Sequence, residues 1–144
     1  MADNVNLKTV HGLRIEAGAW TPTIAGYTVA GSNTYANQTG IYYKIGRLVH
    51  CHGRVALSTK DGTMNGGIRI AGLPFAASVG YHSINFGQVS YFNYAENSIG
   101  LMGYAIGNEI PLYEAVDNGN RLAVLPTRIQ NNTDILFSLV YTIA

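Results

Sequence analysis

The sequence predicts an all-β fold, a jelly-roll-like antiparallel β-sandwich formed by one domain of 144 residues. From Trp20 onward, short runs rich in Val, Ile, Tyr, Phe and Thr are separated by clusters of Gly, Asn, Ser and Pro. No segment shows the 3.6-residue period of an amphipathic helix. Two runs instead alternate with a period of two, the spacing of side chains on one face of a strand. A chain of this length buries enough surface to fold without disulfides or metals.

The expected strands follow this punctuation along the chain. They cover residues 22–29, 40–45, 47–58, 67–72, 81–92, 98–106, 109–116, 121–126 and 133–143. Turns between them carry residues that accept a positive φ, as tight hairpins require, at 60–62 (KDG), 65–67 (NGG) and 117–120 (DNGN). Residues 1–17 alternate only loosely, and we expect them to form a lead-in segment before a β-sandwich domain over residues 18–144.

The last strand has one face that belongs in the core. Its inward set is large and apolar: Ile135, Phe137, Leu139, Tyr141 and Ile143. Leu136 and Val140 occupy the opposite face, which a lone two-layer sandwich leaves in solvent. We therefore expect Leu136 and Val140 to lie in a contact between subunits.

The strand at 47–58 alternates in the same way. Val49, Cys51 and Val55 face inward, and the single cysteine is expected to be a buried thiol without a redox role. His50 and His52 share the outward face. A His-x-His pair can bind a metal, but no carboxylate or cysteine on that face completes a site. We expect no metal and no cofactor, and place the two imidazoles at the subunit contact instead.

The low charge excludes several classes of partner. Only 12% of residues are charged, about half the usual share, and the net charge is +1. No cluster of Lys and Arg offers the cations that nucleic acid binding needs. No run of 18 apolar residues predicts membrane insertion. The surface is therefore expected to be neutral and polar, or covered in part by a partner.

The acidic residues do not predict a catalytic pair. A glycosidase needs two facing carboxyl groups. Glu109 and Glu114 are five positions apart, so on one strand they point to opposite faces. Asp61, Asp117 and Asp134 are expected in turns. No nucleophile motif such as Gly-x-Ser-x-Gly is present. We expect a non-enzymatic protein, with a small polysaccharide hydrolase as a disfavoured alternative.

Aromatic residues and amides gather in one stretch that is expected to form a loop. The candidate carbohydrate-binding residues there are Tyr91, Phe92, Asn93, Tyr94 and Asn97. An aromatic ring can stack on the apolar face of a sugar while amides bind its hydroxyl groups. The alternative is that most of these rings fill the core or a subunit contact.

Three segments resemble, in this order, the C-terminal domains of bacteriophage tail fibres and tailspikes. They are residues 18–24 (GAWTPTI), residues 33–35 (NTY) with 39–49 (TGIYYKIGRLV), and residues 67–75 (GIRIAGLPF). The matched positions look structural: Trp20 and Pro22 anchor the entry to the domain, and Gly40 and Gly46 form turns. The likeness covers residues 18–144, with the second half similar in rhythm only.

The resemblance implies a homotrimer at the tip of an elongated appendage of the virion, made in the cytoplasm of the bacterial host and joined to upstream fibre or spike segments. It implies a role in adsorption, in which the domain binds host lipopolysaccharide or capsular glycan. The alternative is a trimerisation or folding cap that binds no receptor. In tailspikes that degrade polysaccharide the enzyme is a separate upstream domain, so the resemblance also implies no catalysis here.

Overall fold

The protein is described by a computed structural model covering residues 5–10 and 12–144. Within these residues, eleven strands and one short 3-10 helix form the fold. The strands are β1 (Val5–Val10), β2 (Leu13–Trp20), β3 (Thr23–Gly26), β4 (Thr34–Ile45), β5 (Leu48–Thr59), β6 (Ile68–Ala71), β7 (Ala77–Phe92), β8 (Ser98–Gly107), β9 (Glu109–Val116), β10 (Leu122–Ala123) and β11 (Ile129–Thr142). The helix η1 spans Pro126–Arg128. The expected all-β class is confirmed.

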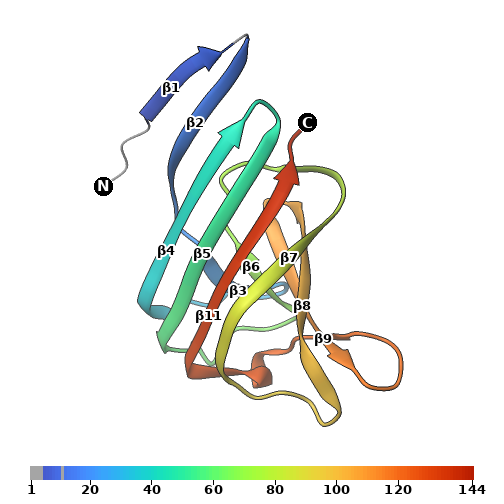
Figure 1. Cartoon of the computed structure of the whole chain (residues 1–144). Coiled ribbons are helices and arrows are strands. Elements are labelled where there is room, and N and C mark those ends of the chain that lie inside the picture. Colours follow the sequence, from blue (N-terminus) through green and yellow to red (C-terminus); the bar gives the residue numbers. More distant parts are fainter. Residues whose placement is uncertain (1–4, 11) are drawn as a thin grey trace.

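The strands form one curled antiparallel sheet in place of two separate ones. Their order is β1-β2-β4-β5-β11-β7-β8-β9-β6-β3, with β10 paired to β9. Strands β4, β5 and β11 lie side by side in one half of the sheet, and β6, β8 and β9 form the other half behind them (Figure 1). The hairpin of β1 and β2 extends beyond the curled body at the upper left of the view. The two halves therefore enclose one core between them.

Strand boundaries agree best with the punctuation of the sequence for β5, β6, β8 and β9. Strands β7 and β11 begin four residues before the expected 81 and 133, and the expected strand 121–126 is only β10, followed by η1 from Pro126. Further differences lie at the start of the chain. Residues 13–17, expected in the lead-in segment, belong to β2, which pairs with β4 from Ile15 and Ile45 to Trp20 and Gly40. Strand β4 also begins earlier than expected, at Thr34. β2 is ordered by pairing with β1 and β4, and the first part of β4 by pairing with β5, so local alternation does not predict either.

The core confirms the expected faces of the two alternating strands. Ile135, Phe137, Leu139 and Tyr141 of β11 are buried, as are Val49, Cys51 and Val55 of β5. His50, Arg54, Leu136 and Val140 lie on the outward face, with His52 only partly exposed there. Burial raises the pKa of the Cys51 thiol to about 12, so the thiol is protonated at neutral pH. The buried cysteine agrees with the sequence prediction.

Gly40 and Gly53 make room for two core rings, those of Trp20 and Phe137. Trp20 pairs with Gly40, Gly40 with Gly53, and Gly53 with Phe137, in one row across four strands. The rings of Trp20 and Phe137 meet edge to face with centroids 5.9 Å apart. A Cβ atom on Gly53 would lie 2.8 Å from Cζ of Phe137, so the row needs glycine at that position. The prediction that Gly40 forms a turn is therefore wrong: it lies within β4, where it and Trp20 have a packing role, whereas Gly46 has the positive φ of a turn residue.

In the part of the chain that the structure describes, no helix is long and apolar enough to cross a membrane.

Candidate functional site

The loop between β7 and β8, residues 93–97, has an unusual backbone at both ends. Tyr91 has a φ of 54° and Asn97 a φ of 65°. These are the only non-glycine residues with positive φ among the described ones. Asparagine tolerates this conformation, whereas a tyrosine there is uncommon and costs energy. Backbone strain of this kind gathers at functional sites, so the loop is a candidate for binding.

An ion pair between Glu114 and Arg128 contacts the loop at residues 93–97 from the interior of the protein. The side chain of Glu114 is fully buried, and one of its carboxylate oxygens accepts a hydrogen bond of 2.7 Å from the backbone N–H of Ala95. The other oxygen lies 2.9 Å from Nε of Arg128. The backbone N–H of Asn93 donates to the carbonyl oxygen of Arg128 at 2.8 Å. The loop is therefore tied at two points, at Ala95 to Glu114 of β9 and at Asn93 to Arg128 just before β11.

The structure brings four of the five predicted loop residues to the surface. Tyr91 is 61% exposed and Tyr94 39% exposed, and Asn93 and Asn97 are exposed as well. Phe92 is instead buried and packs against Tyr94 with ring centroids 4.7 Å apart. The prediction that Phe92 contacts the carbohydrate is therefore wrong. Its ring instead supports the ring of Tyr94. Partial burial, with a smaller contribution from the charge of Glu114, raises the pKa of Tyr94, whose hydroxyl stays a donor at neutral pH.

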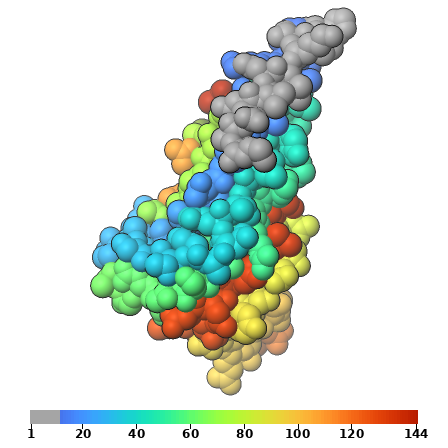
Figure 2. Space-filling view, turned by 90° about the vertical axis from the view of Figure 1, so that its left-hand side faces the viewer, coloured from blue at the N-terminus to red at the C-terminus, as the bar shows by residue number. Residues whose placement is uncertain are grey.

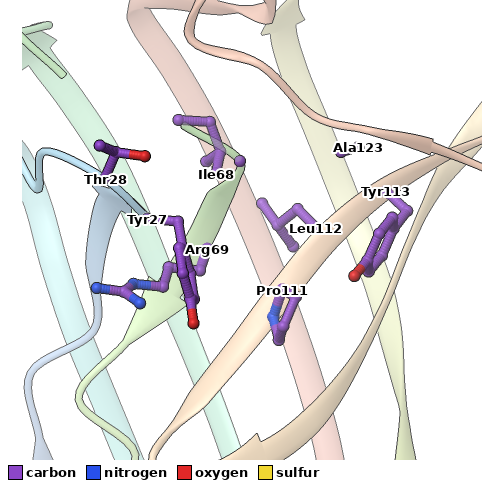
Figure 3. Close-up of a pocket in the computed structure, with 9 residues that line it drawn as sticks. Tyr27, Thr28, Ile68, Arg69, Pro111, Leu112, Tyr113 and Ala123 are labelled. Atoms are coloured by element: carbon purple, nitrogen blue, oxygen red, sulfur yellow. The ribbon is translucent and has the colours of Figure 1, made fainter. Parts of the chain in front are cut away.

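A second candidate, which no local pattern of the sequence indicates, lies on the outer surface of β6 and β9. This tyrosine groove has a volume of about 230 Å³. It is lined by Tyr27, Thr28, Gly67, Ile68, Arg69, Pro111, Leu112, Tyr113 and Ala123. The rings of Tyr27 and Tyr113 stand on either side of Pro111, and the guanidinium group of Arg69 lies beside Tyr27 (Figure 3). Pairing of Arg69 with Pro111 brings the two strands together here.

Arginine side chains cover the aromatic rings of this surface. Arg69 lies over Tyr27 at 5.0 Å from the ring centroid, and Arg121 lies over Tyr113 at 4.3 Å. Tyr113 stacks on Tyr104 at 5.7 Å, and the two hydroxyl groups hydrogen-bond at 3.1 Å. Cation-π contacts of this kind hold flexible guanidinium groups in place. The rings of Tyr27, Tyr104 and Tyr113 and the guanidinium groups of Arg69 and Arg121 therefore contact one another in two clusters on the outer surface.

The third surface is the outward side of β4, β5 and β11, called here the β4–β5–β11 face. Its residues include Ile41, Tyr43, His50, His52, Leu136 and Val140. Cross-strand pairing places Tyr43 beside His50 and His50 beside Val140, whereas Leu136 pairs with Arg54, so apolar, aromatic and polar side chains alternate on this face. Leu136 is 41% exposed and Val140 50% exposed. Atoms of the cyan, green and red strands β4, β5 and β11 adjoin one another in the space-filling view (Figure 2).

The two histidines lie together on this face, where the sequence analysis places them. Their ring centroids are 6.2 Å apart, and Tyr43 stacks on His52 at 6.4 Å. Across residues 5–10 and 12–144, no three His, Cys, Asp or Glu side chains are close enough to bind one metal ion. The two imidazoles and the ring of Tyr43 form an aromatic cluster on this face.

The carboxylates are placed as follows. Glu109 points outward and pairs with Arg69 at 2.8 Å, whereas Glu114 points inward, so the expected opposite orientation is confirmed. Asp134 is not in a turn, which corrects the prediction. It lies within β11, nearly buried, where it forms a two-pronged ion pair with Arg54 at 3.0 and 2.7 Å. The arginine fork explains how a carboxylate is tolerated in that strand.

Comparison with known proteins gives a match in structure only. No protein-family model and no curated protein sequence matches the chain. The chain is similar to the crystal structure of the Dettilon tailspike protein (gp208), with a TM-score of 0.73 and 16% sequence identity. The match covers 89% of this chain and 24% of the tailspike chain, so this chain spans about a quarter of that protein's length. At this level of identity the likeness establishes a shared fold.

Proposed function

We propose that this chain is a domain of a phage tail fibre or tailspike that binds host-surface carbohydrate during adsorption. The loop at residues 93–97, bounded by the positive φ angles of Tyr91 and Asn97, carries the proposal. The fold shared with part of a phage tailspike supports the setting. The partner is lipopolysaccharide or capsular glycan of the host, and the place of action is the tail of the virion.

The loop has the chemistry that a neutral glycan requires. The exposed rings of Tyr91 and Tyr94 offer apolar surfaces to the C–H face of a sugar. The amides of Asn93 and Asn97 offer donors and acceptors to its hydroxyl groups. The loop is held by Glu114 before any ligand arrives, which lowers the entropy lost on binding. Binding needs no covalent step, so the proposal is a non-enzymatic one without a cofactor.

The test measures binding of purified host polysaccharide by the wild-type chain and by two variants of one residue. Tyr91→Ala removes the ring and is expected to lower affinity about tenfold, since stacking and burial of one ring contribute roughly 1–2 kcal/mol. Tyr91→Phe keeps the ring and serves as the matched control, with affinity close to wild type. Equal binding by all three proteins would exclude Tyr91 as a contact. No binding of wild type to polysaccharide from any susceptible host would reject the proposed function.

A second candidate function is a trimerisation or folding cap that binds no receptor. The exposed apolar and aromatic side chains of the β4–β5–β11 face, among them Ile41, Tyr43, Leu136 and Val140, favour it, because large exposed hydrophobic groups gathered on one face are a feature of contacts between proteins. The occupants would be two further copies of this chain, joined around a three-fold axis with His50 and His52 in the contact. Three carbohydrate sites on one trimer would also gain avidity, so the two functions are compatible.

The proposed trimerisation role is tested by measuring the molar mass of the protein in solution. Leu136→Asp with Val140→Asp is expected to convert a trimer into monomers, because two charges would be buried without partners. Light scattering coupled to size exclusion measures the change, and Ile99→Asp, at an exposed position of β8, is the control. A wild-type chain that is already a monomer, or an unchanged mass of the double variant, argues against this role.

A further inference from the structure

The tyrosine groove has the size and walls of a small binding site. Its volume of about 230 Å³ is below the roughly 300–1,000 Å³ of clefts that enclose drug-sized ligands, so it suits a single sugar ring. Ile68 and Leu112 give it an apolar floor, and Gly67 leaves one part of the wall without a side chain. A Cβ atom on Gly67 would meet nothing within 4 Å, so this part of the groove is open.

One wall of the groove is the ring of Tyr27, which Arg69 contacts on one face. Tyr27 is 70% exposed, so part of the ring remains accessible for stacking. Arg69 holds the ring by its cation-π contact at 5.0 Å. A large exposed aromatic ring fixed at the edge of an apolar depression is the feature that sugar rings use for stacking.

Two guanidinium groups lie at the groove: Arg69 is one of its lining residues, and Arg121, outside the lining, lies over the ring of Tyr113. Arg69 pairs with Glu109, but Nε of Arg69 is buried and has no hydrogen-bond partner among the described residues. Arg121 is exposed, and no carboxylate of residues 5–10 or 12–144 forms an ion pair with it. Guanidinium groups recognise carboxylate and phosphate through paired donors. A neutral sugar would leave these donors unused.

We infer that the tyrosine groove is a second carbohydrate site, distinct from the loop at residues 93–97, and that it takes a sugar ring bearing an anionic group. The ring stacks on Tyr27 above the apolar floor. Its carboxylate or phosphate reaches the guanidinium group of Arg121. The inference rests on the proposed function and adds the class of sugar, which is an acidic component of the host surface glycan.

The first test titrates the isotope-labelled chain with three monosaccharides and follows backbone amide signals by NMR. Methyl glucuronide carries a carboxylate, glucose 6-phosphate a phosphate, and methyl glucoside no charge. We expect shifts at Tyr27, Gly67 and Tyr113 with one or both anionic sugars, and at least about tenfold weaker binding of methyl glucoside. Tighter binding of methyl glucuronide would indicate a capsular uronic acid, and tighter binding of glucose 6-phosphate a phosphorylated core sugar. Equal binding of the neutral sugar, or no shift in the groove with any of them, would overturn the inference.

The second test uses variants that leave the fold intact. Arg121→Gln is at an exposed position and is expected to reduce the preference for the anionic sugar to near that of methyl glucoside. Gly67→Leu fills the groove and is expected to abolish binding of all three sugars there. Gly62→Leu is the matched control, because Gly62 lies in an exposed turn where a Cβ atom also meets nothing. Unchanged sugar binding by Gly67→Leu would contradict the site.

The two proposals fail differently. If Tyr91→Ala lowers polysaccharide binding while Gly67→Leu does not, the groove inference is wrong and the proposed function remains. If Gly67→Leu and Arg121→Gln lower binding while Tyr91→Ala does not, the groove is the carbohydrate site and the loop assignment is wrong. If wild type binds no host polysaccharide and no acidic sugar, both are rejected.

Discussion

Gly40 lies where the chain has no room for a side chain, and its substitution tests how the core is built. A Cβ atom at this position would be 2.6 Å from Cε2 and 2.7 Å from Cδ1 of Trp20, whereas real Cβ contacts essentially never fall below 3.0 Å. The obstacle is a buried ring and not the end of a flexible side chain, so Gly40→Ala must displace Trp20. Overpacking of this kind costs about 1–3 kcal/mol.

The assay is thermal unfolding followed by fluorescence. Trp20 is the single tryptophan, so its emission reports the displaced ring directly. For a chain of this size, a loss of 1 kcal/mol lowers Tm by about 4 °C, which gives an expected decrease of about 4–12 °C for Gly40→Ala. Protein concentration must be equal in all samples, because association of the chains would also stabilise the fold.

A double-mutant cycle with Trp20→Leu identifies the cause. Once the ring is gone, Gly40→Ala should cost little, with a coupling energy between about 0.5 and 3 kcal/mol. Gly62→Ala is the control, expected to be neutral or slightly stabilising because the site is open. A Tm of Gly40→Ala equal to wild type with unchanged emission would refute the packing argument.

Three further predictions concern buried and charged groups. Cys51 should not react with thiol reagents in the folded chain, since burial raises its pKa to about 12 and excludes the reagent, and should react fully in guanidinium; rapid labelling of the native chain would contradict this. Glu114→Gln should cost about 3 kcal/mol in urea unfolding, because Arg128 loses its counter-charge; a loss below about 0.5 kcal/mol would show that the ion pair does not hold the loop. Hydrogen bonds from the backbone N–H groups of Thr63 and Ser32 lower the pKa of Asp61, so Asp61 stabilises the fold above its unfolded pKa near 3.8 and the effect is lost as pH falls through the lower folded value. Asp61→Asn should therefore differ from wild type in unfolding at neutral pH but not at strongly acidic pH; a constant difference would exclude this linkage.

Local patterns in the sequence were enough to orient the strands that alternate cleanly. In β5 and β11 a period of two separates apolar from polar positions, and the structure buries the apolar set. Leu136 and Val140 were recognisable as an anomaly because they are apolar on the polar side. The turns were recognisable from glycine and asparagine, and Gly66 and Gly119 do have positive φ.

The period of two does not predict which side chains are buried in a strand that contains a bulge, because a bulge changes which positions face the core. β7 pairs with β11 through two irregularities in register, one between Leu136 and Phe137 and one between Ile129 and Asp134. A bulge moves the following side chains to the other face. Ile84 and Phe86 face the core before the first irregularity, Val89 after it, and Phe92 after the second, so the inward positions change from even to odd numbers and back.

The tyrosine groove could not be predicted from local patterns in the sequence. Tyr27 follows β3, Arg69 lies in β6 and Tyr113 in β9, and these strands become neighbours only through the order β9-β6-β3. That order crosses the sequence, so no spacing of residues predicts it. The same holds for Asp134, whose place in β11 depends on Arg54 of the neighbouring strand.

The most direct test of carbohydrate binding is a crystal structure of the chain with an oligosaccharide released from the surface of a susceptible host. The account predicts a sugar ring against Tyr91 or Tyr94, with hydroxyl groups bonded to Asn93 or Asn97, and an acidic ring in the tyrosine groove. An oligosaccharide bound only elsewhere, or none bound under conditions where the host polysaccharide saturates the intact virion, would contradict it.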